Sequence, residues 1–300
     1  MKILLFGKNG QVGWELQRSL LPLGDLIALD RNSPELCGDL TNLKGIAETI
    51  QKFAPNIIIN AAAYTNVDKA EEEQDLARTI NTEAPGIMAN EAKKLNAWFV
   101  HYSTDYVFDG NGNNLKKECD STAPLNVYGK TKRDGEKLIS TSNCHHLIFR
   151  TSWVYGAYGN NFIRTMLRLG KERDSLKVVD DQISAPTSAE LLADITTHAV
   201  RTALQHPNVS GLYHLAANGY TSWHAYARLI FEQAQKLGFE LKIQPDQLIS
   251  IPSSEFPTLA KRPLNSRLNT QKLQTTFNIN LPSWETPVRR TVTEILARNS

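Results

Sequence analysis

Residues 2–13 read KILLFGKNGQVG, a short apolar run that passes directly into three evenly spaced glycines. The run predicts a buried strand at residues 3–6, and apolar residues at helical spacing predict a helix over residues 11–21. The glycines suit a tight bend, close approach of the backbone to a pyrophosphate, and close packing of the helix on a sheet. The spacing is GxxGxxG and not GxGxxG, so an ordinary strand-to-helix turn is the competing interpretation. We expect a dinucleotide phosphate at this positive helix end, held by Gly7, Gly10, Gln11, Val12 and Gly13.

Strands and helices alternate along the chain beyond this turn. Strands are predicted at residues 26–29, 57–59, 97–102 and 147–149, and helices at 42–53, 76–95 and 126–140. Such alternation is typical of βαβ units. The predicted fold class is therefore α/β, with a Rossmann-type doubly wound parallel sheet and a smaller mixed C-terminal substrate domain. We expect a dinucleotide-binding domain over residues 1–150, with returning segments from 175–205, and an interleaved substrate-binding domain over 151–300.

The C-terminal half has a looser pattern. Strands are predicted at residues 177–179 and 211–215, and helices at 188–204, 222–237 and 283–298. Residues 244–270 are rich in Pro, Ser and Arg, which predicts irregular structure over a binding face.

Composition and charge exclude several classes of function. The formal net charge is +2 without a basic block, so neither a nucleic acid nor an anionic membrane is an expected partner. Three widely spaced cysteines, Cys37, Cys119 and Cys144, predict neither a disulfide framework nor a zinc site. No apolar stretch approaches the ~20 residues of a membrane span. The first apolar run ends at Phe6, too early for a signal peptide, and we expect a cytoplasmic protein.

Residues after the second and third strands predict the adenosine end of the cofactor site. Asp30 suits the ribose hydroxyls of NAD, whereas Arg31 suits the 2′-phosphate of NADP, so we expect both NADH and NADPH to be used. An exposed surface charge is an equal interpretation of Arg31. Further candidate contacts are Asp39 and Leu40 at the adenine edge. The small residues Ala61, Ala62 and Ala63 would leave room for the cofactor, with simple packing as the alternative.

The segment YGKTK, residues 128–132, places a phenol and an ammonium one helical turn apart. Lys132 would favour the phenolate form of Tyr128 and lower its pKa towards that of a useful general acid. The same ammonium could hold the nicotinamide ribose. Gly135 lies on nearly the same face and predicts close approach to cofactor or sheet, since glycine costs about 1 kcal/mol inside a helix. Standing alone, the motif would more often be a surface pair.

Polar residues at the ends of the next strands predict the substrate end. Thr104 should end the fourth strand, where it could donate a hydrogen bond to a substrate carbonyl, or simply cap a turn. Asp105 could bind sugar hydroxyls. Trp153 could form a wall for the sugar or belong to the core. Lys261 and Arg262 could face a diphosphate.

The combination of the GxxGxxG turn, Asp39, Thr104 and the Tyr128-x-x-x-Lys132 pair resembles the extended short-chain dehydrogenase/reductases. Longer segments resemble the bacterial dTDP-4-dehydrorhamnose reductase family, among them NAAAYTNVDKAE (60–71), STDYVFDG (103–110), PLNVYGKTKRDGE (124–136) and DDQISAPTS (180–188). The resemblance implies a Thr104–Tyr128–Lys132 triad and adds Thr65 as a cofactor contact. It also implies a homodimer and an association with magnesium, for which no ligands are evident in the sequence.

The resemblance implies reduction of the 4-keto group of dTDP-4-dehydro-L-rhamnose to dTDP-L-rhamnose, with NADH or NADPH as reductant. The product would serve cell-surface polysaccharides such as the lipopolysaccharide O-antigen. Two other functions stay open from the residues: a related sugar-nucleotide epimerase, and a non-catalytic NADP-binding regulatory subunit. A 4,6-dehydratase is disfavoured because Tyr106 stands after Thr104 and Asp105, where such enzymes typically place a glutamate.

Overall fold

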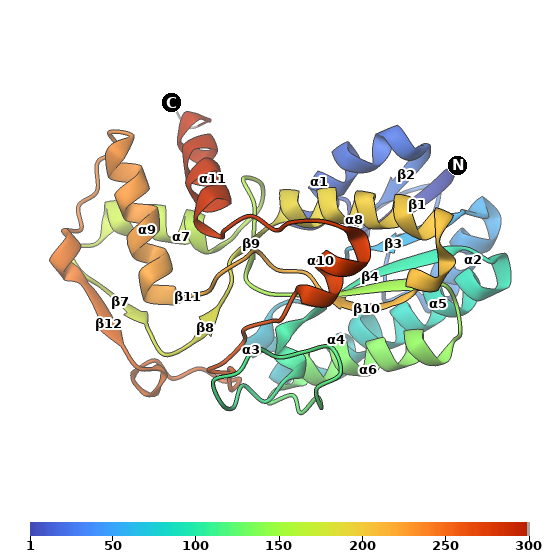
Figure 1. Ribbon diagram of the computed structural model, residues 1–300, viewed down its shortest axis with the longest axis horizontal. Coiled ribbons are helices and arrows are strands. Elements are labelled where there is room, and N and C mark those ends of the chain that lie inside the picture. The colour runs from blue at the N-terminus through green and yellow to red at the C-terminus, as the bar shows by residue number, and fades with distance from the viewer. Residues whose placement is uncertain (299–300) are drawn as a thin grey trace.

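A computed structural model of the chain describes residues 1–298. Within that range the main sheet has six strands, all parallel, in the order β10-β5-β4-β3-β1-β2 (Figure 1). Their bounds are β1 (Lys2–Phe6), β2 (Asp25–Leu29), β3 (Ile57–Asn60), β4 (Trp98–Thr104), β5 (His146–Thr151) and β10 (Gly211–His214). The predicted parallel α/β sheet is confirmed. The strand order reverses between β1 and β3, and ligands bind beyond the carboxyl ends of strands at such a point.

Helices cover both faces of this sheet, which is why its strands are apolar runs and not alternating patterns. One face packs against α1 (Gln11–Leu20), α8 (Ala189–Gln205) and α10 (Gln271–Phe277). The other face packs against α2 (Leu43–Phe53), α5 (Ala84–Leu95) and α6 (Val127–Thr141). In Figure 1, α1 and α8 lie above the sheet, and α5 and α6 lie below it. The first core therefore includes elements from far beyond residue 150, and the predicted division at that residue stays a prediction.

A second group of elements has its own core, seen on the left of Figure 1. It comprises α7 (Phe162–Glu172), α9 (Trp223–Lys236) and α11 (Glu285–Ala297) with three short strand pairs. The pairs join β6 (Val154–Tyr155) to β9 (Thr187–Ser188), β7 (Leu176–Val179) to β12 (Leu248–Ile251), and β8 (Ile183–Ser184) to β11 (Thr221–Ser222). The last two residues of the predicted 151–300 domain lie outside the described range.

Two sequence predictions about elements are wrong. Residues 244–270 contain β12, because Leu248 and Ile251 are buried against β7, although the rest of the segment is irregular. The single helix predicted over 76–95 is divided into α4 (Gln74–Arg78), a π-helical turn η2 (Thr79–Glu83) and α5, and follows α3 (Val67–Glu72). Pro85 explains the wider turn, because its ring would clash with the carbonyl of Asn81 in a regular helix.

Short 3₁₀ turns complete the fold: η1 (Leu21–Leu23), η3 (Asp105–Val107), η4 (Pro207–Val209), η5 (Pro245–Gln247) and η6 (Ser253–Glu255). Across residues 1–298 there is no helix of the length and apolar character needed to cross a bilayer.

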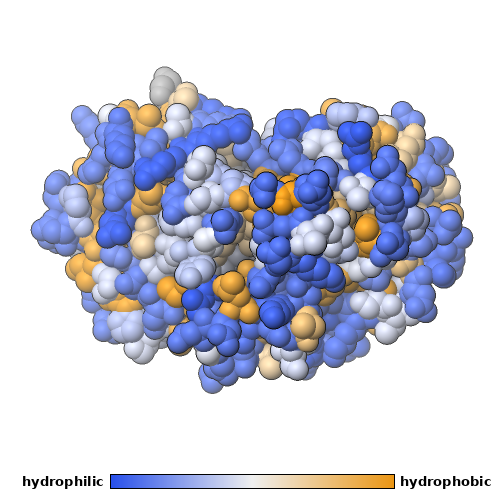
Figure 2. All heavy atoms as spheres, in the orientation of Figure 1, coloured by the Kyte–Doolittle hydropathy of each residue, from blue (hydrophilic) through white to orange (hydrophobic). Residues whose placement is uncertain are grey.

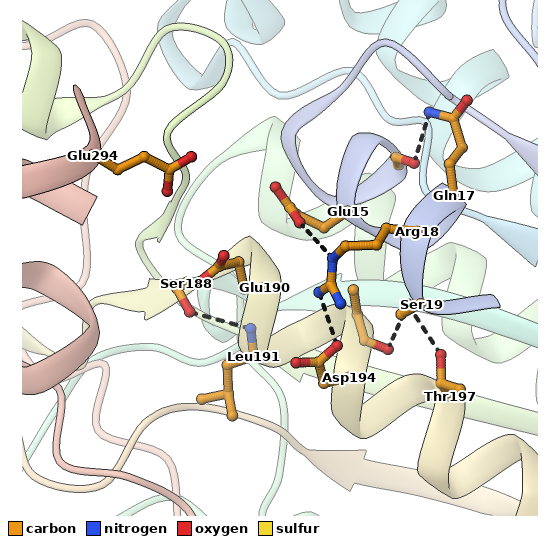
Figure 3. A network of polar contacts seen from close by, with 12 residues as sticks. Glu15, Gln17, Arg18, Ser19, Ser188, Glu190, Leu191, Asp194, Thr197 and Glu294 are labelled. Atoms are coloured by element: carbon orange, nitrogen blue, oxygen red, sulfur yellow. Dashed lines mark hydrogen bonds and ion pairs between the residues drawn. The ribbon is translucent and has the colours of Figure 1, made fainter. Parts of the chain in front are cut away.

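A charged notch separates α11 from the α1–α8 pair, and Figure 2 shows it at the top of the molecule. Arg18 spans its floor, with Nη2 at 3.0 Å from Asp194 Oδ1 and Nε at 3.5 Å from Glu15 Oε2 (Figure 3). Beside it, the Ser19 hydroxyl donates to the Ala193 carbonyl oxygen. These contacts attach α8 to α1, so residues 189–205 are held on the main sheet by polar bonds as well as by apolar packing.

Candidate active site

A cavity of about 730 Å³ opens at the carboxyl ends of β1, β3, β4 and β5. Its lining includes residues from both halves of the chain, which become neighbours only when the chain folds. Predicted residues on its lining are Gly7, Gly10, Gln11, Val12, Ala61, Ala62, Ala63, Thr65, Thr104, Asp105, Tyr128, Lys132 and Trp153.

The glycines after β1 are required by backbone geometry and close contacts. Gly7 has φ +91°, and a Cβ there would lie 2.7 Å from the Ala62 backbone nitrogen. A Cβ on Gly13 would lie 2.0 Å from the Gly7 carbonyl oxygen, so Gly13 lets α1 sit against the turn. Gly10 caps α1 without a side-chain hydrogen bond, which leaves the first N–H groups of the helix for a ligand. This arrangement fits the pyrophosphate of a dinucleotide.

A second cavity of about 270 Å³ continues from the glycine turn and is lined by Asp30, Arg31, Asp39 and Leu40. Asp30 Oδ2 accepts a hydrogen bond from Asn9 Nδ2 at 2.6 Å. The guanidinium of Arg31 lies 3.6 Å from Asp39 Oδ1, so its charge is already partly paired. Asp30 and Arg31 thus both line the cavity at the predicted place, and the geometry favours neither NAD nor NADP.

Thr104, the last residue of β4, caps a turn, which is one of the two roles that the sequence left open; donation to a substrate carbonyl stays a prediction. Its hydroxyl oxygen accepts a hydrogen bond from Tyr106 N at 3.1 Å, which caps the turn η3. The same hydroxyl donates to Asp105 Oδ1 at 3.0 Å, and it faces the cavity. Burial raises the pKa of Asp105 to about 6, against the hydrogen bonds it accepts.

Tyr128 and Lys132 both line the cavity, but their charges differ from the sequence prediction. Burial raises the pKa of Tyr128 to about 12, partly opposed by a hydrogen bond with Thr104. Burial lowers the pKa of Lys132 to about 7, partly opposed by the Glu136 carboxylate. The predicted lowering of the Tyr128 pKa by Lys132 is therefore wrong for this structure, because a buried amine that loses its charge has little effect on a neighbouring phenol.

The glycines of α6 serve contacts between helices and turns. A Cβ on Gly129 would lie 2.1 Å from the Tyr106 carbonyl oxygen, and one on Gly135 would lie 2.3 Å from the Asn81 carbonyl oxygen. The prediction that Gly135 approaches cofactor or sheet is wrong, since its neighbour is the π-helical turn η2. The two glycines let α6 lie close enough to its neighbours to present Tyr128 and Lys132 to the cavity.

Two aromatic residues from distant segments form the far wall of the cavity. Trp153 follows β5 in a left-handed conformation, with φ +45°, and stacks on Trp223 with ring centroids 3.5 Å apart. Both rings line the cavity and also pack on the second core. Sequence reasoning missed Trp223, whose only local signal is its place at the start of α9.

Arg262, predicted at a diphosphate, forms an ion pair with Asp68, with Nη2 at 2.7 Å from Oδ2. The carbonyl oxygen of Lys261 accepts a hydrogen bond from Asn126 Nδ2 at 2.8 Å. These contacts hold the irregular C-terminal segment against α3 and the start of α6, beside the cavity. In the described part of the chain, no three or more His, Cys, Asp or Glu side chains are grouped to hold a metal ion.

In a comparison with known families, residues 1–297 match the family described as RmlD substrate binding domain. The chain belongs to the RmlD family. It is 57% identical to dTDP-4-dehydrorhamnose reductase of Salmonella typhimurium over 295 residues, covering 98% of each chain. A crystal structure of a dTDP-4-dehydrorhamnose reductase from Clostridium acetobutylicum superposes with a TM-score of 0.88 and 37% identity, covering 99% of this chain and all of that one.

A further solved structure bears on the cofactor. It is a dTDP-4-dehydrorhamnose reductase from Bacillus anthracis in complex with NADP, with a TM-score of 0.86 and 36% identity over 98% of this chain and 99% of that one. The predicted family resemblance is thereby confirmed.

Proposed function

We propose that this chain is an NAD(P)H-dependent sugar-nucleotide reductase that converts the 4-keto group of dTDP-4-dehydro-L-rhamnose to the hydroxyl of dTDP-L-rhamnose, for cell-surface polysaccharide synthesis. The observation that carries the proposal is one cavity in which the glycine turn lies together with Thr104, Tyr128 and Lys132. A relative that matches over 98% of both chains and is named dTDP-4-dehydrorhamnose reductase supports the proposed substrate. The NADP complex of a 36% identical relative supports the cofactor.

The residues around the two cavities fit a dinucleotide. The Gly7–Gly13 turn would hold the pyrophosphate, while Asp30, Arg31, Asp39 and Leu40 would surround the adenosine. Lys132 would bind the nicotinamide ribose. When bound, the reduced nicotinamide supplies the hydride that reduces the ketone.

Tyr128 is suited to give a proton to the alkoxide that forms at C4. Its high pKa keeps it protonated at neutral pH, and an alkoxide is a stronger base than a phenolate. Thr104 would donate to the substrate carbonyl by rotating its hydroxyl away from Asp105. Asp105 and Trp153 would hold the sugar, through its hydroxyls and its apolar face respectively.

The test is consumption of NADH or NADPH by the purified protein with enzymatically made dTDP-4-dehydro-L-rhamnose, with dTDP-L-rhamnose identified as product. Stoichiometric loss of reduced cofactor and gain of product would support the reductase. Cofactor binding without turnover would reject it and favour the regulatory subunit. Conversion of a sugar nucleotide with no net cofactor consumption would favour the epimerase.

We also propose that the protein is a cytoplasmic homodimer, on the support of the family resemblance and of cysteine usage. Light scattering in solution tests the dimer. Magnesium is implied only by the family resemblance, and the described residues include no group of three or more His, Cys, Asp or Glu side chains to hold it. Turnover measured with and without a chelator tests whether the reaction needs the ion.

A further inference from the structure

Lys132 belongs to a buried series of polar side chains whose arrangement the proposed reaction leaves unexplained. Its Nζ lies 3.1 Å from His101 Nε2 and 2.5 Å from the backbone oxygen of Tyr102. On the other side of the imidazole, His101 Nδ1 lies 3.2 Å from Asn60 Nδ2. Asn60, His101 and Lys132 are each no more than 2% exposed. Water cannot exchange freely with such groups, so the direction of each hydrogen bond must be consistent along the series.

The orientation of the Asn60 amide determines that direction. Asn60 Oδ1 accepts a hydrogen bond from the Ala62 backbone nitrogen at 3.1 Å, so the amide nitrogen is the atom that faces His101. An amide nitrogen is only a donor. His101 Nδ1 must therefore be the unprotonated, accepting nitrogen of the ring.

The proton of a neutral His101 is then on Nε2, directed at Lys132. Burial alone keeps the pKa of His101 below its usual value, and any charge on Lys132 would lower it further, so the ring is neutral. An ammonium group has three donors and no acceptor, whereas a neutral amine has a lone pair. Only a neutral Lys132 can accept from Nε2–H while it donates to the Tyr102 oxygen.

We propose that Asn60 and His101 are positioning residues that hold Lys132 as a neutral amine in the cofactor-free protein, and that binding of the nicotinamide cofactor places a proton on Lys132. The proposal rests on the proposed function, since the ribose hydroxyls are the new hydrogen-bond acceptors that favour the ammonium form. The proton comes from the buffer and forms one N–H bond at Nζ, without breaking any bond of the cofactor.

The other ionisable groups around Lys132 are consistent with this change. Glu136, one turn further along α6, favours the charged form but is itself paired with Arg150 of β5, at 2.6 Å. Tyr128, one turn earlier, is protonated. Protonation of Lys132 would place a cation beside this phenol only when cofactor is bound. The predicted lowering of the Tyr128 pKa would thus depend on cofactor binding.

The first test uses the cofactor-free protein and ¹⁵N NMR of its seven histidines. We expect one buried signal of the Nε2–H tautomer that disappears in His101→Gln. In Asn60→Asp, the new carboxylate accepts from Nδ1–H, so the proton moves to Nδ1 and Nε2 becomes an acceptor for a charged Lys132. An Nδ1–H tautomer of His101 in the wild type would overturn the proposal.

The second test measures proton uptake by calorimetry of NADPH binding at about pH 8 in buffers of different ionisation enthalpy. Since the pKa of Lys132 is about 7 without cofactor, the wild type should take up nearly one proton, and affinity should weaken as the pH rises above that value. Asn60→Asp should take up much less, whereas Asn208→Asp, which adds the same charge at an exposed site, should resemble the wild type.

The outcomes separate this inference from the proposed function. Wild-type protein that binds NADPH without proton uptake refutes the inference and leaves the reductase intact. Wild-type protein that does not bind NADPH refutes the proposed function itself. Both wild-type measurements stand on their own if the Asn60→Asp variant does not fold.

Discussion

The proposed chemistry depends most directly on Tyr128, because its hydroxyl is the proposed proton donor. A change to phenylalanine removes only that hydroxyl. Tyr128→Phe should lower turnover about 10²- to 10⁴-fold, the usual contribution of a positioned acid. Cofactor affinity should stay near the wild-type value, since the ring and its contact with Tyr106 remain. Steady-state rates and NADPH titration check the two parts, and wild-type turnover in the variant would exclude Tyr128 as the proton donor.

Two glycines of the turn are expected to have different roles, Gly13 in packing the turn and Gly10 in binding the cofactor. Gly13→Ala puts a methyl group 2.0 Å from the Gly7 carbonyl oxygen and should cost about 1–3 kcal/mol of stability. Gly10→Ala meets its nearest neighbour at 3.4 Å and lines the cavity, so it should leave stability nearly unchanged and weaken NADPH binding. Thermal unfolding and NADPH titration of the pair would show the contrast, and equal effects on both readouts would contradict it.

Asp105 makes stability depend on pH in a defined direction. Its folded pKa of about 6 lies above the ordinary value of 3.8, so folding favours the protonated form. The stabilisation from this group is present below about pH 3.8 and is lost as the pH rises towards about 6. Asp105→Asn mimics the protonated acid, and its unfolding temperature relative to wild type should rise across that window. A constant difference between the two proteins would contradict the raised pKa.

The positions of the site residues were predictable where a local motif indicates them. Gly7, Thr104, Tyr128 and Lys132 lie on one cavity because each follows a strand end or a helical spacing that the sequence displays. The charge of Lys132 was not predictable, since it depends on burial and on His101 from another strand. The catalytic and binding roles themselves stay predictions until the variants are measured.

The helix α6 shows how an element can contain a glycine that is poor for the helix and necessary for the fold. Gly135→Ala gains about 1 kcal/mol of helix propensity but places a methyl group 2.3 Å from the Asn81 carbonyl oxygen. Backbone cannot move aside like a flexible side chain, so we expect a net loss of about 1–3 kcal/mol. Lys137→Ala, at an exposed position of the same helix, should stay within about 0.5 kcal/mol of wild type in denaturant unfolding. A stabilised Gly135→Ala would mean that α6 and η2 can separate freely.

Most elements were predictable from short apolar runs and helical spacing. β1, β3 and α1 begin and end within about a residue or two of their predicted limits, because buried parallel strands and amphipathic helices differ clearly in length and pattern. The π-helical turn η2 was not predictable, since apolar spacing continues through it and only Pro85 indicates the change. β12 was missed because four residues are too few for a reliable period.

At the scale of the whole molecule, one polar contact joins the last irregular segment to the active-site region. Asp68 accepts from Ala260 N at 3.0 Å and pairs with Arg262, which also contacts the Tyr106 hydroxyl beside the cavity. Asp68→Asn should raise the KM for the sugar nucleotide about fivefold, equivalent to about 1 kcal/mol for a partly exposed pair, and leave cofactor affinity unchanged.

The matched control removes a similar charge elsewhere. Asp174→Asn breaks an exposed pair with Lys242 and should leave both constants at their wild-type values. An unchanged KM in Asp68→Asn would show that the C-terminal segment does not need this ion pair to complete the substrate site.

The participation of α10 in the first core has a consequence for how the chain is made. Leu273 and Phe277 belong to the same apolar cluster as Ile3 and Ile57, and α10 itself packs on β10 and α8, so a cluster that begins at β1 is completed by one of the last helices. A ribosome releases these segments in order, and β1 leaves long before α10 exists. An unfinished chain therefore exposes the part of this apolar cluster at β10 until almost all of the protein has emerged. Because this core is completed only by a late segment, we expect the nascent chain to bind chaperones during synthesis. We also expect premature termination before α10 to leave the core incomplete.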